Sequence, residues 1–302
     1  MKNKFLPIKR LVKFLISSTI FLIIIAILFI LNNNYGDTRY SIEDLKLARQ
    51  ASANWLLTNR DIILQEHNAI LWWMLKQGSQ QPHDDKVLNL FNEYKKVNFD
   101  FYSRSPWSYL ILDVRPQIDV NALLNEEKRD DNLLFIYGMT CHSLLGQEPA
   151  IKRQLDQRFC ANQQPVLPAC TTHQLLGIQF MQENNCGDKE QNAMVSEILL
   201  KTIKTQLTLD FRVVDVYLQR NLMLAKSGKF ESIRKRWIKR ILNAQLRDGG
   251  WQDFQPLIPV NNTQYFGFRF AIRENRSSFH ATAQGYWLMS MLIAAHEPKA
   301  DS

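Results

Sequence analysis

Glycine and proline are scarce in this chain. It has only 11 Gly and 10 Pro among 302 residues, whereas all-β folds need both residue types at their many turns. Hydrophobic residues make up 46% of the sequence and include 17 Phe and 7 Trp, which is enough for a large core. The composition therefore argues against an all-β fold, and the length allows one large domain or two small ones.

The net positive charge is small beyond the first 13 residues. The net charge is +8, but Lys2, Lys4, Lys9, Arg10 and Lys13 supply +5 with no acidic residue among them, which leaves +3 for the rest of the chain. A domain that binds nucleic acid normally has a strongly basic face. We therefore expect no nucleic-acid partner.

An uncharged apolar run follows the basic segment. Residues 14–31 contain 18 residues, of which only Ser17, Ser18 and Thr19 are polar. This is the lower length limit for a membrane-spanning helix, and the preceding basic residues place the amino terminus in the cytoplasm. A cleaved signal peptide is the alternative, but its apolar region would be shorter and would end at a small-x-small site, which is missing here.

This run suggests four regions along the chain. We predict a cytoplasmic segment over residues 1–13, a single-pass anchor in the inner membrane over 14–31, a linker over 32–40 and a periplasmic or extracellular helical body over 41–302. The membrane is thus the expected partner of the chain.

Cysteine is limited to four residues, and no Cys-x-x-Cys pair occurs. Cys160 and Cys170 bracket a short loop that contains two prolines, which favours a disulfide between them. Cys141–Cys186 would follow if the other two thiols also pair, and such bonds persist in an oxidising compartment. The rival interpretation is a zinc site that uses Cys170 and His173. We expect no metal or other cofactor.

Hydrophobic residues recur at helical spacing through most of the body. We expect 10 to 12 helices, with a large loop or a short helix over residues 98–120 and no helix over residues 251–277. The expected helices cover roughly residues 41–57, 61–76, 82–94, 121–127, 131–146, 149–159, 169–182, 189–206, 210–226, 231–246 and 277–296. The prediction is an all-α body, either an α/α toroid with an inner ring of helices inside an outer ring, or an open helical solenoid.

A seven-residue pattern occurs at residues 140–146 and again at 171–177, and a looser copy lies at 279–285. In the first two copies a histidine, His142 or His173, precedes a glycine by four residues, which places both on one face of a helix. We expect His142, His173 and His280 to lie on inner helices around a common cavity. The simpler interpretation is a set of partly buried histidines hydrogen-bonded to nearby backbone.

Charged residues interrupt the apolar helix expected over 210–226. Arg212, Asp215 and Gln219 share one helical stripe. They form either a structural ion pair, because buried charges are normally paired, or part of a cavity in which Asp215 acts as a catalytic acid.

Residues 245–251 carry a recognisable motif formed by Gln245, Asp248, Gly249, Gly250 and Trp251. It resembles the Gln-x-x-Asp-Gly-Gly-Trp repeat of the terpenoid cyclase and protein prenyltransferase superfamily of α/α toroids, and the resemblance covers about residues 231–295. The resemblance implies that the motif closes an outer helix and turns the chain toward the next inner helix.

The catalytic residues of that superfamily are matched only in part. Its prenyltransferases bind zinc through an Asp-x-Cys pair and a later histidine that follows an aromatic residue. The matching positions are Asp215, Tyr217 and Phe279-His280, so Tyr217 replaces the thiolate. The Asp-x-Asp-Asp motif of class II terpene cyclases is absent. The resemblance therefore implies the fold and not the activity.

Two functional hypotheses remain. In the first, the protein is an anchored enzyme that acts on a cell-envelope carbohydrate or isoprenoid in the toroid cavity. Its catalytic residues would be His280 and Asp215, and the cavity would be lined by His142, His173, Arg212, Gln219 and Gln284. In the second, it is a non-catalytic domain that binds a small-molecule or glycan ligand, or a partner. A deep cavity beside Asp215 and His280 would favour the first hypothesis, and a centre filled by Phe and Trp side chains would favour the second.

Overall fold

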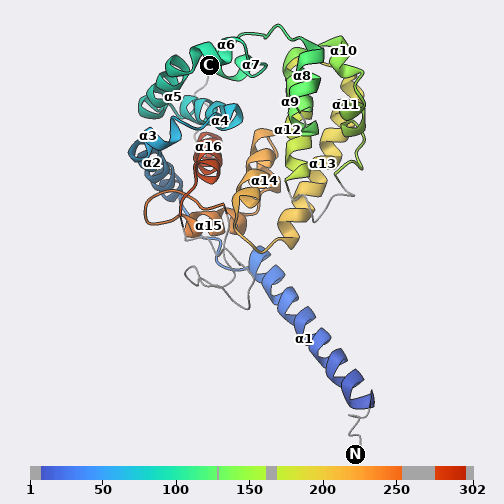
Figure 1. Ribbon diagram of the computed structural model, residues 1–302. Coiled ribbons are helices and arrows are strands. Elements are labelled where there is room, and N and C mark those ends of the chain that lie inside the picture. The colour runs from blue at the N-terminus through green and yellow to red at the C-terminus, as the bar shows by residue number, and fades with distance from the viewer. Residues whose placement is uncertain (1–7, 128, 161–168, 254–275, 297–302) are drawn as a thin grey trace, which may run out of the picture.

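A computed structural model describes residues 8–127, 129–160, 169–253 and 276–296 of the chain (Figure 1). The described residues form 16 α-helices and one 3-10 turn, and they contain no strand beyond an isolated bridge between Trp251 and Ser278. The all-α prediction is therefore confirmed. The helices are α1 (Ile8–Asn34), α2 (Ile42–Thr58), α3 (Arg60–Ile63), α4 (Ala69–Gln80), α5 (Asp85–Val97), α6 (Phe99–Ser103), α7 (Ser108–Leu112), α8 (Val120–Glu126), α9 (Asp130–Thr140), α10 (Ser143–Gly146), α11 (Pro149–Gln154), α12 (Cys170–Asn184), α13 (Lys189–Leu209), α14 (Asp215–Lys226), α15 (Lys235–Ala244) and α16 (Phe279–His296), with the 3-10 turn η2 (Phe230–Ser232) before α15.

The helix count exceeds the expected 10 to 12 because several predicted helices are interrupted. The helix expected over residues 131–146 stops at Cys141, which takes a left-handed φ of 52° between α9 and α10. The helix expected over 61–76 is divided into α3 and α4, since Asn68 caps α4 through its side chain. Residues 98–120, predicted to be a large loop or a short helix, contain two short helices, α6 and α7. Residues 254–275, most of the second irregular stretch, lie outside the described residues.

Five helices of the body form a parallel row in the order α4, α16, α14, α12, α9. The parallel direction of α9 and α12 follows from their contacts: Asp131 and His173 meet in the first turns, and Cys141 and Cys186 are bonded just after the two carboxyl ends. Between α12 and α14, Thr172 near the start of α12 donates to Gln219 in the first half of α14. The starts of α14 and α16 meet at Asp215 and His280, and those of α4 and α16 meet at Trp72 and Phe279. All neighbouring helices of the row therefore run in the same direction.

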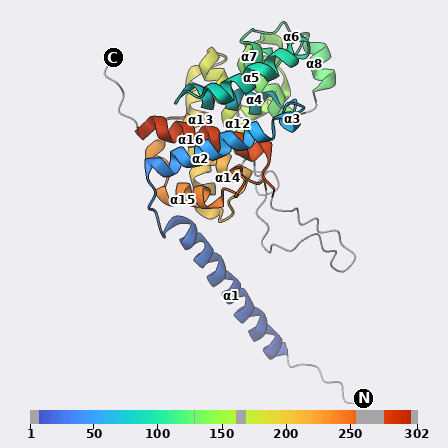
Figure 2. The ribbon, with the colours of Figure 1, turned by 90° about the vertical axis from the view of Figure 1, so that its left-hand side faces the viewer.

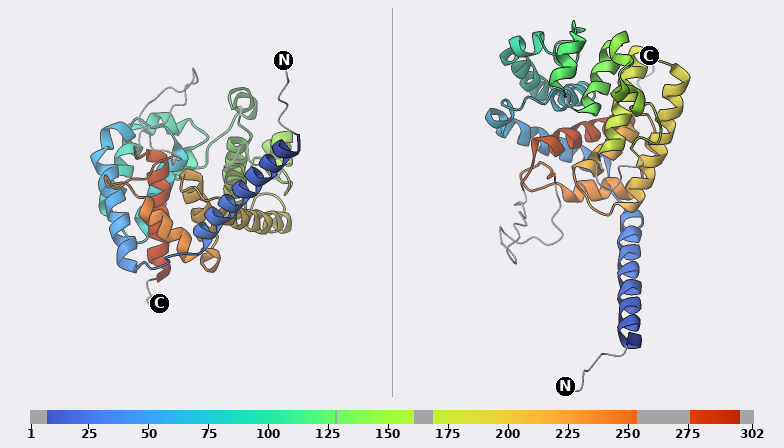
Figure 3. Two further views of the ribbon diagram at one scale, coloured as in Figure 1. Left: turned by 90° about the horizontal axis from the view of Figure 1, so that it is seen from below. Right: turned by 45° about the vertical axis from the view of Figure 1, so that its right-hand side comes forward.

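The other long helices of the body lie outside this row. Helix α13 returns antiparallel to α12, because Gln206 near its end donates to Thr171 at the start of α12. Figure 2 and the left view of Figure 3 show α2 alongside α16, where Arg49 in the middle of α2 donates to Ser290 in the second half of α16. Along the chain, α2, α5, α13 and α15 thus alternate with helices of the central row.

Glycines allow close approach within the row. A Cβ atom added to Gly177 would lie 2.5 Å from the Leu134 side chain of α9. One added to Gly138 would lie 2.9 Å from the carbonyl oxygen of Gly177. The α9–α12 contact therefore needs bare backbone on both helices, and the second copy of the repeated pattern places Gly177 at this contact.

Aromatic side chains fill the middle of the row. Trp73 of α4 lies 5.2 Å from Phe180 of α12 and 5.0 Å from Trp287 of α16, measured between ring centroids and with edge-to-face geometry in both cases. All three side chains are buried. The contact between Trp73 and Phe180 joins two helices that are not neighbours along the row.

Helix α1 extends away from the body (Figure 1). The segment Arg10–Asn34 is long and apolar enough to span a membrane, and its most apolar window is not buried against the rest of the protein.

The body contains two cysteine pairs at bonding distance, Cys160–Cys170 and Cys141–Cys186. The two pairings match the sequence prediction, and they point to an oxidising compartment.

Candidate functional site

The Gln245–Trp251 motif is the structural junction that positions the site. The Gln245 side chain donates to the carbonyl oxygens of Gly249, 2.7 Å away, and of Ala48 in α2, 2.8 Å away. Gly249 has a φ of 95°, and a Cβ atom there would lie 2.3 Å from the carbonyl oxygen of Ala51. The motif therefore ends α15 and fastens it to α2.

The second half of the motif contacts the start of α16. Asp248 accepts hydrogen bonds from Trp55 of α2 and from Ser277, at 3.2 and 2.6 Å. Trp251 is buried, and its backbone N–H donates to the Thr282 hydroxyl at 3.1 Å. These bonds fix the position of the residues that follow Trp251 relative to the first turn of α16.

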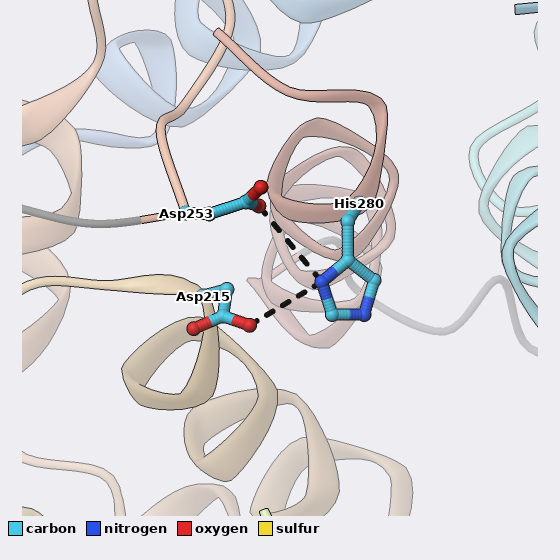
Figure 4. Close-up of side chains that lie close together, drawn as sticks. All are labelled: Asp215, Asp253 and His280. Carbon is cyan, nitrogen blue, oxygen red and sulfur yellow. Dashed lines mark ion pairs between the residues drawn. The ribbon is translucent and has the colours of Figure 1, made fainter. Parts of the chain in front are cut away.

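Three side chains meet at this junction (Figure 4). Asp215 is the first residue of α14, His280 lies in the first turn of α16, and Asp253 follows Trp251 by two residues. The His280 Nδ1 atom lies 3.3 Å from Asp215 Oδ2 and 3.9 Å from Asp253 Oδ1. One ligand atom from each residue lies within 4.8 Å of the other two. We call this group the Asp–Asp–His cluster.

Neighbouring groups hold each member of the cluster. The Asp215 carboxylate accepts from the backbone N–H of Val216 at 2.6 Å. The Ser278 hydroxyl donates to Asp253 Oδ1, and the carbonyl oxygen of Asp253 accepts from the backbone N–H of Asp215. The three side chains are between 27% and 38% exposed, so the cluster is ordered by the fold and still open to solvent.

Gln284 lies behind the imidazole. It is fully buried one helical turn after His280, and its amide lies 3.1 Å from His280 Nε2. Because the oxygen and nitrogen of an amide can exchange places, Gln284 can either donate to Nε2 or accept from an Nε2–H group. In the second case Nδ1 carries the lone pair and directs it at the two carboxylates.

The cluster lies near the carboxyl end of α1. Asn33 and Asn34 of α1 are buried in the body, where Asn33 donates to the carbonyl oxygen of Leu207 at 2.7 Å. Phe29 of α1 stacks on Phe211 with ring centroids 5.0 Å apart. Asp215 follows Phe211 by four residues, so it is at most about 14 Å from that residue.

His173 was expected in a common cavity with His280, but it forms an ion pair with Asp131. Its Nδ1 atom is 2.8 Å from Asp131 of α9, which also binds Arg129. Burial alone would raise the pKa of the Asp131 carboxyl, but the hydrogen bonds from His173 and Arg129 outweigh it and hold that pKa well below its usual range. His173 is therefore paired within the α9–α12 contact and is not part of the Asp–Asp–His cluster.

The expectation that His142 lies on an inner helix is wrong. His142 precedes α10 as its N-cap residue, just beyond the carboxyl end of α9. Asp131 and His173 meet at the opposite end of α9, which has 11 residues and is thus about 16 Å long. Helix α9 ends before Cys141 because this residue takes a left-handed conformation and is bonded to Cys186.

Arg212 and Gln219 do not join the cluster either. Arg212 binds Asp210 in the connection before α14, because α14 begins at Asp215 and the helical stripe predicted from Arg212 onward does not form. Gln219 is buried and accepts from Thr172 at 2.7 Å. Both residues hold α14 in place.

Tyr217, at the position of the prenyltransferase thiolate, cannot act as a ligand. Its side chain is fully buried, and its hydroxyl donates to Asn33 of α1 at 3.0 Å. Burial raises the pKa of this hydroxyl, which keeps it protonated. The prenyltransferase zinc site therefore does not fit this chain.

Asp253, which the sequence analysis missed, is the third member of the cluster. Its only signal was its place two residues after the Gly-Gly-Trp motif.

No protein-family model, no curated protein and no solved structure matches this chain. The resemblance to the toroid superfamily therefore rests on the sequence, chiefly on the Gln245–Trp251 motif.

Proposed function

We propose that the protein is a membrane-anchored enzyme with an α/α-toroid body that binds a divalent cation at Asp215, Asp253 and His280. The observation that carries this proposal is the convergence of three ligand atoms from three separate segments. The enzyme acts outside the cytoplasm, with its amino terminus inside and its body periplasmic or extracellular.

The alternation of helices supports the toroid. Helices of the central row alternate along the chain with helices outside it, and the row helices run parallel. Trp73 and Phe180 bring α4 into contact with α12 across the middle of the row. Such a cross-contact is expected of a row that curves into a ring, whereas an open solenoid would keep these helices apart.

The geometry of the cluster supports the cation. Nitrogen and oxygen ligands bind zinc and similar ions at about 2.0–2.2 Å, so two ligands of one ion lie about 3–4 Å apart. The 3.3 and 3.9 Å separations of the cluster are in this range. Two carboxylates and one imidazole suit Mn²⁺, Fe²⁺ or Zn²⁺. Gln284 would accept from the His280 Nε2–H group and so keep the Nδ1 lone pair on the cation, a common role for a residue behind a histidine ligand.

The cation would act as a Lewis acid on a negatively charged or carbonyl oxygen of the substrate. The chain itself supplies the position of this site. Asn33, Asn34 and Phe29 attach α1 to the body beside the start of α14. This places the Asp–Asp–His cluster close to the membrane surface, which favours an isoprenoid-linked substrate held in the bilayer over a free carbohydrate.

The first experiment measures cation binding by the full-length protein in detergent. After treatment with a chelator, Mn²⁺ is titrated by calorimetry. We expect one bound ion per chain and at least a tenfold loss of affinity in Asp253→Asn and His280→Ala. His173→Ala, which removes the histidine of the other Asp–His pair, is the matched control and should bind as the wild type does.

An alternative account makes the cluster an ion pair between a protonated His280 and two carboxylates. In that case the wild type would give no saturable Mn²⁺ signal, and His280→Ala would only lower the melting temperature. That result would refute the cation site.

A second experiment tests the substrate class separately. The protein is placed in phosphatidylcholine nanodiscs with or without an isoprenoid phosphate. If this lipid is bound beside the cation, it should increase the Mn²⁺ affinity, because coupling between two ligands is reciprocal. Equal affinity in both discs would reject the isoprenoid and leave the cation site intact.

The second candidate function is a non-catalytic domain that binds a ligand or partner. The burial of Trp73, Phe180 and Trp287 in the middle of the row favours it, because these side chains pack against one another there. Turnover of envelope lipids by the wild type, lost in Asp253→Asn and followed by mass spectrometry, would distinguish the enzyme from this candidate.

A further inference from the structure

A cleft opens at the carboxyl ends of the row helices, away from the Asp–Asp–His cluster. Its volume is about 920 Å³, and its walls come from α4, α7, α12, α14 and α16. Lys226, at the end of α14, lines this cleft. Because α14 has 12 residues, Lys226 lies about 17 Å from Asp215 along the helix. The two sites are therefore separate.

The floor of the cleft is aromatic. Trp73, Phe180 and Trp287, which meet in the middle of the row, also line the cleft, and half-buried Tyr109 and Phe230 line it as well. Their mutual contacts hold the rings in fixed positions. Trp73, Phe180 and Trp287 are only 8%, 1% and 5% exposed, so the aromatic surface open to a ligand is mainly that of Tyr109 and Phe230. Such rings can pack against the C–H-bearing face of a ligand.

Three side-chain amides lie above this floor. Gln77, Gln80 and Gln81 come from the last turn of α4 and the residue after it. Within the described part of the chain, none of the three amides forms a hydrogen bond. An amide offers both donors and acceptors, so it can bind a hydroxyl group, which is itself both donor and acceptor.

The charged groups of the cleft are already paired. Lys226 forms an ion pair with Glu183, and Asp113 forms one with Lys76 at 2.5 Å. The two carboxylates and the two ammonium groups compensate each other, so the cleft has no net charge from these side chains to attract an ion. An aromatic floor, free amides and balanced charge together describe a site for a neutral ligand that is rich in hydroxyl groups.

We propose that this cleft binds a neutral oligosaccharide, with sugar rings against Tyr109 and Phe230 and hydroxyl groups on the amides of Gln77, Gln80 and Gln81. The volume is at the upper end of the range for small-molecule sites, which suits a chain of a few sugar rings. This inference is independent of the cation site.

The test uses the full-length protein in a detergent without a sugar headgroup, because alkyl maltosides would compete. Chitotetraose, cellotetraose and maltotetraose are titrated while tryptophan fluorescence is recorded, since Trp73 and Trp287 lie at the site. We expect saturable binding of at least one of the three, and an affinity at least fivefold lower in the double variant Gln77→Ala/Gln81→Ala.

Two controls separate this site from other effects. Gln65→Ala removes an exposed amide before α4 and should bind as the wild type does. His280→Ala should also bind normally, so a failure of the cation site does not affect this result. The proposal is overturned if none of the three sugars binds, if the double variant binds like the wild type, or if trigalacturonate, an anionic oligosaccharide, binds more tightly than the neutral sugars.

Discussion

Replacement of Gly249 by alanine tests the junction that positions the candidate site. Two costs add at this residue. Its φ of 95° disfavours any residue with a Cβ atom, at about 1–2 kcal/mol. The new Cβ would also lie 2.3 Å from the carbonyl oxygen of Ala51. Because this neighbour is backbone, α2 must move, and overpacking of this kind costs about 1–3 kcal/mol.

Gly228 provides a matched control for this variant. It also has a positive φ, 69°, but nothing lies within 4 Å of the position its Cβ would take. Gly228→Ala therefore carries the backbone cost alone. The difference between the two variants measures the close approach of α2 to the Gln245–Trp251 motif.

The assay is thermal unfolding of the full-length protein in detergent, followed by circular dichroism. With about 2–4 °C per kcal/mol for a domain of this size, we expect Gly249→Ala to lower the midpoint by roughly 4–20 °C and Gly228→Ala by roughly 2–8 °C. Equal shifts in the two variants would refute the close approach and, with it, the account of the motif as a junction.

Two further predictions concern the α9–α12 pair and the membrane topology. Because the pKa of Asp131 is lowered from 3.8 in the folded protein, its contribution to stability is complete above pH 3.8 and is lost as the pH falls through the lower folded value. Asp131→Asn should therefore reduce the unfolding free energy at pH 7 and have less effect at pH 2; an equal effect at both pH values would contradict this. An alkaline phosphatase fused after Gly36 should be active in a bacterial host, and activity of a cytoplasmic reporter at that point, without phosphatase activity, would reverse the predicted orientation.

Sequence patterns predicted the features that depend on local physics. The uncharged run over residues 14–31, the amphipathic helices and the close spacing of Cys160 and Cys170 are each patterns within a short stretch of chain. The capping box in which Ser41 and Asp44 bind each other's backbone N–H groups is another such case. Hydrophobicity, capping and loop length act over a few residues, so the sequence alone reveals them.

The repeated His-to-Gly pattern shows where this approach fails. His173 and Gly177 lie on one helix as predicted, but His142 does not, because the bond from Cys141 to Cys186 and the left-handed Cys141 end α9 first. A local pattern cannot report a break that a distant cysteine stabilises. The same holds for Asp131, whose partner His173 lies on another helix.

By itself, the sequence determined that this chain is helical and that residues 14–31 form an apolar segment long enough to cross a membrane. It also identified Asp215 and His280 as candidate site residues. Tertiary structure alone decided that these two residues meet, that Asp253 joins them and that the cluster lies beside the end of α1. The physical reason is that helix formation depends on neighbours in sequence, whereas a site depends on how helices pack. Close contacts such as Gly249 against Ala51 and Asn33 against Leu207 fix that packing, and no single segment encodes them.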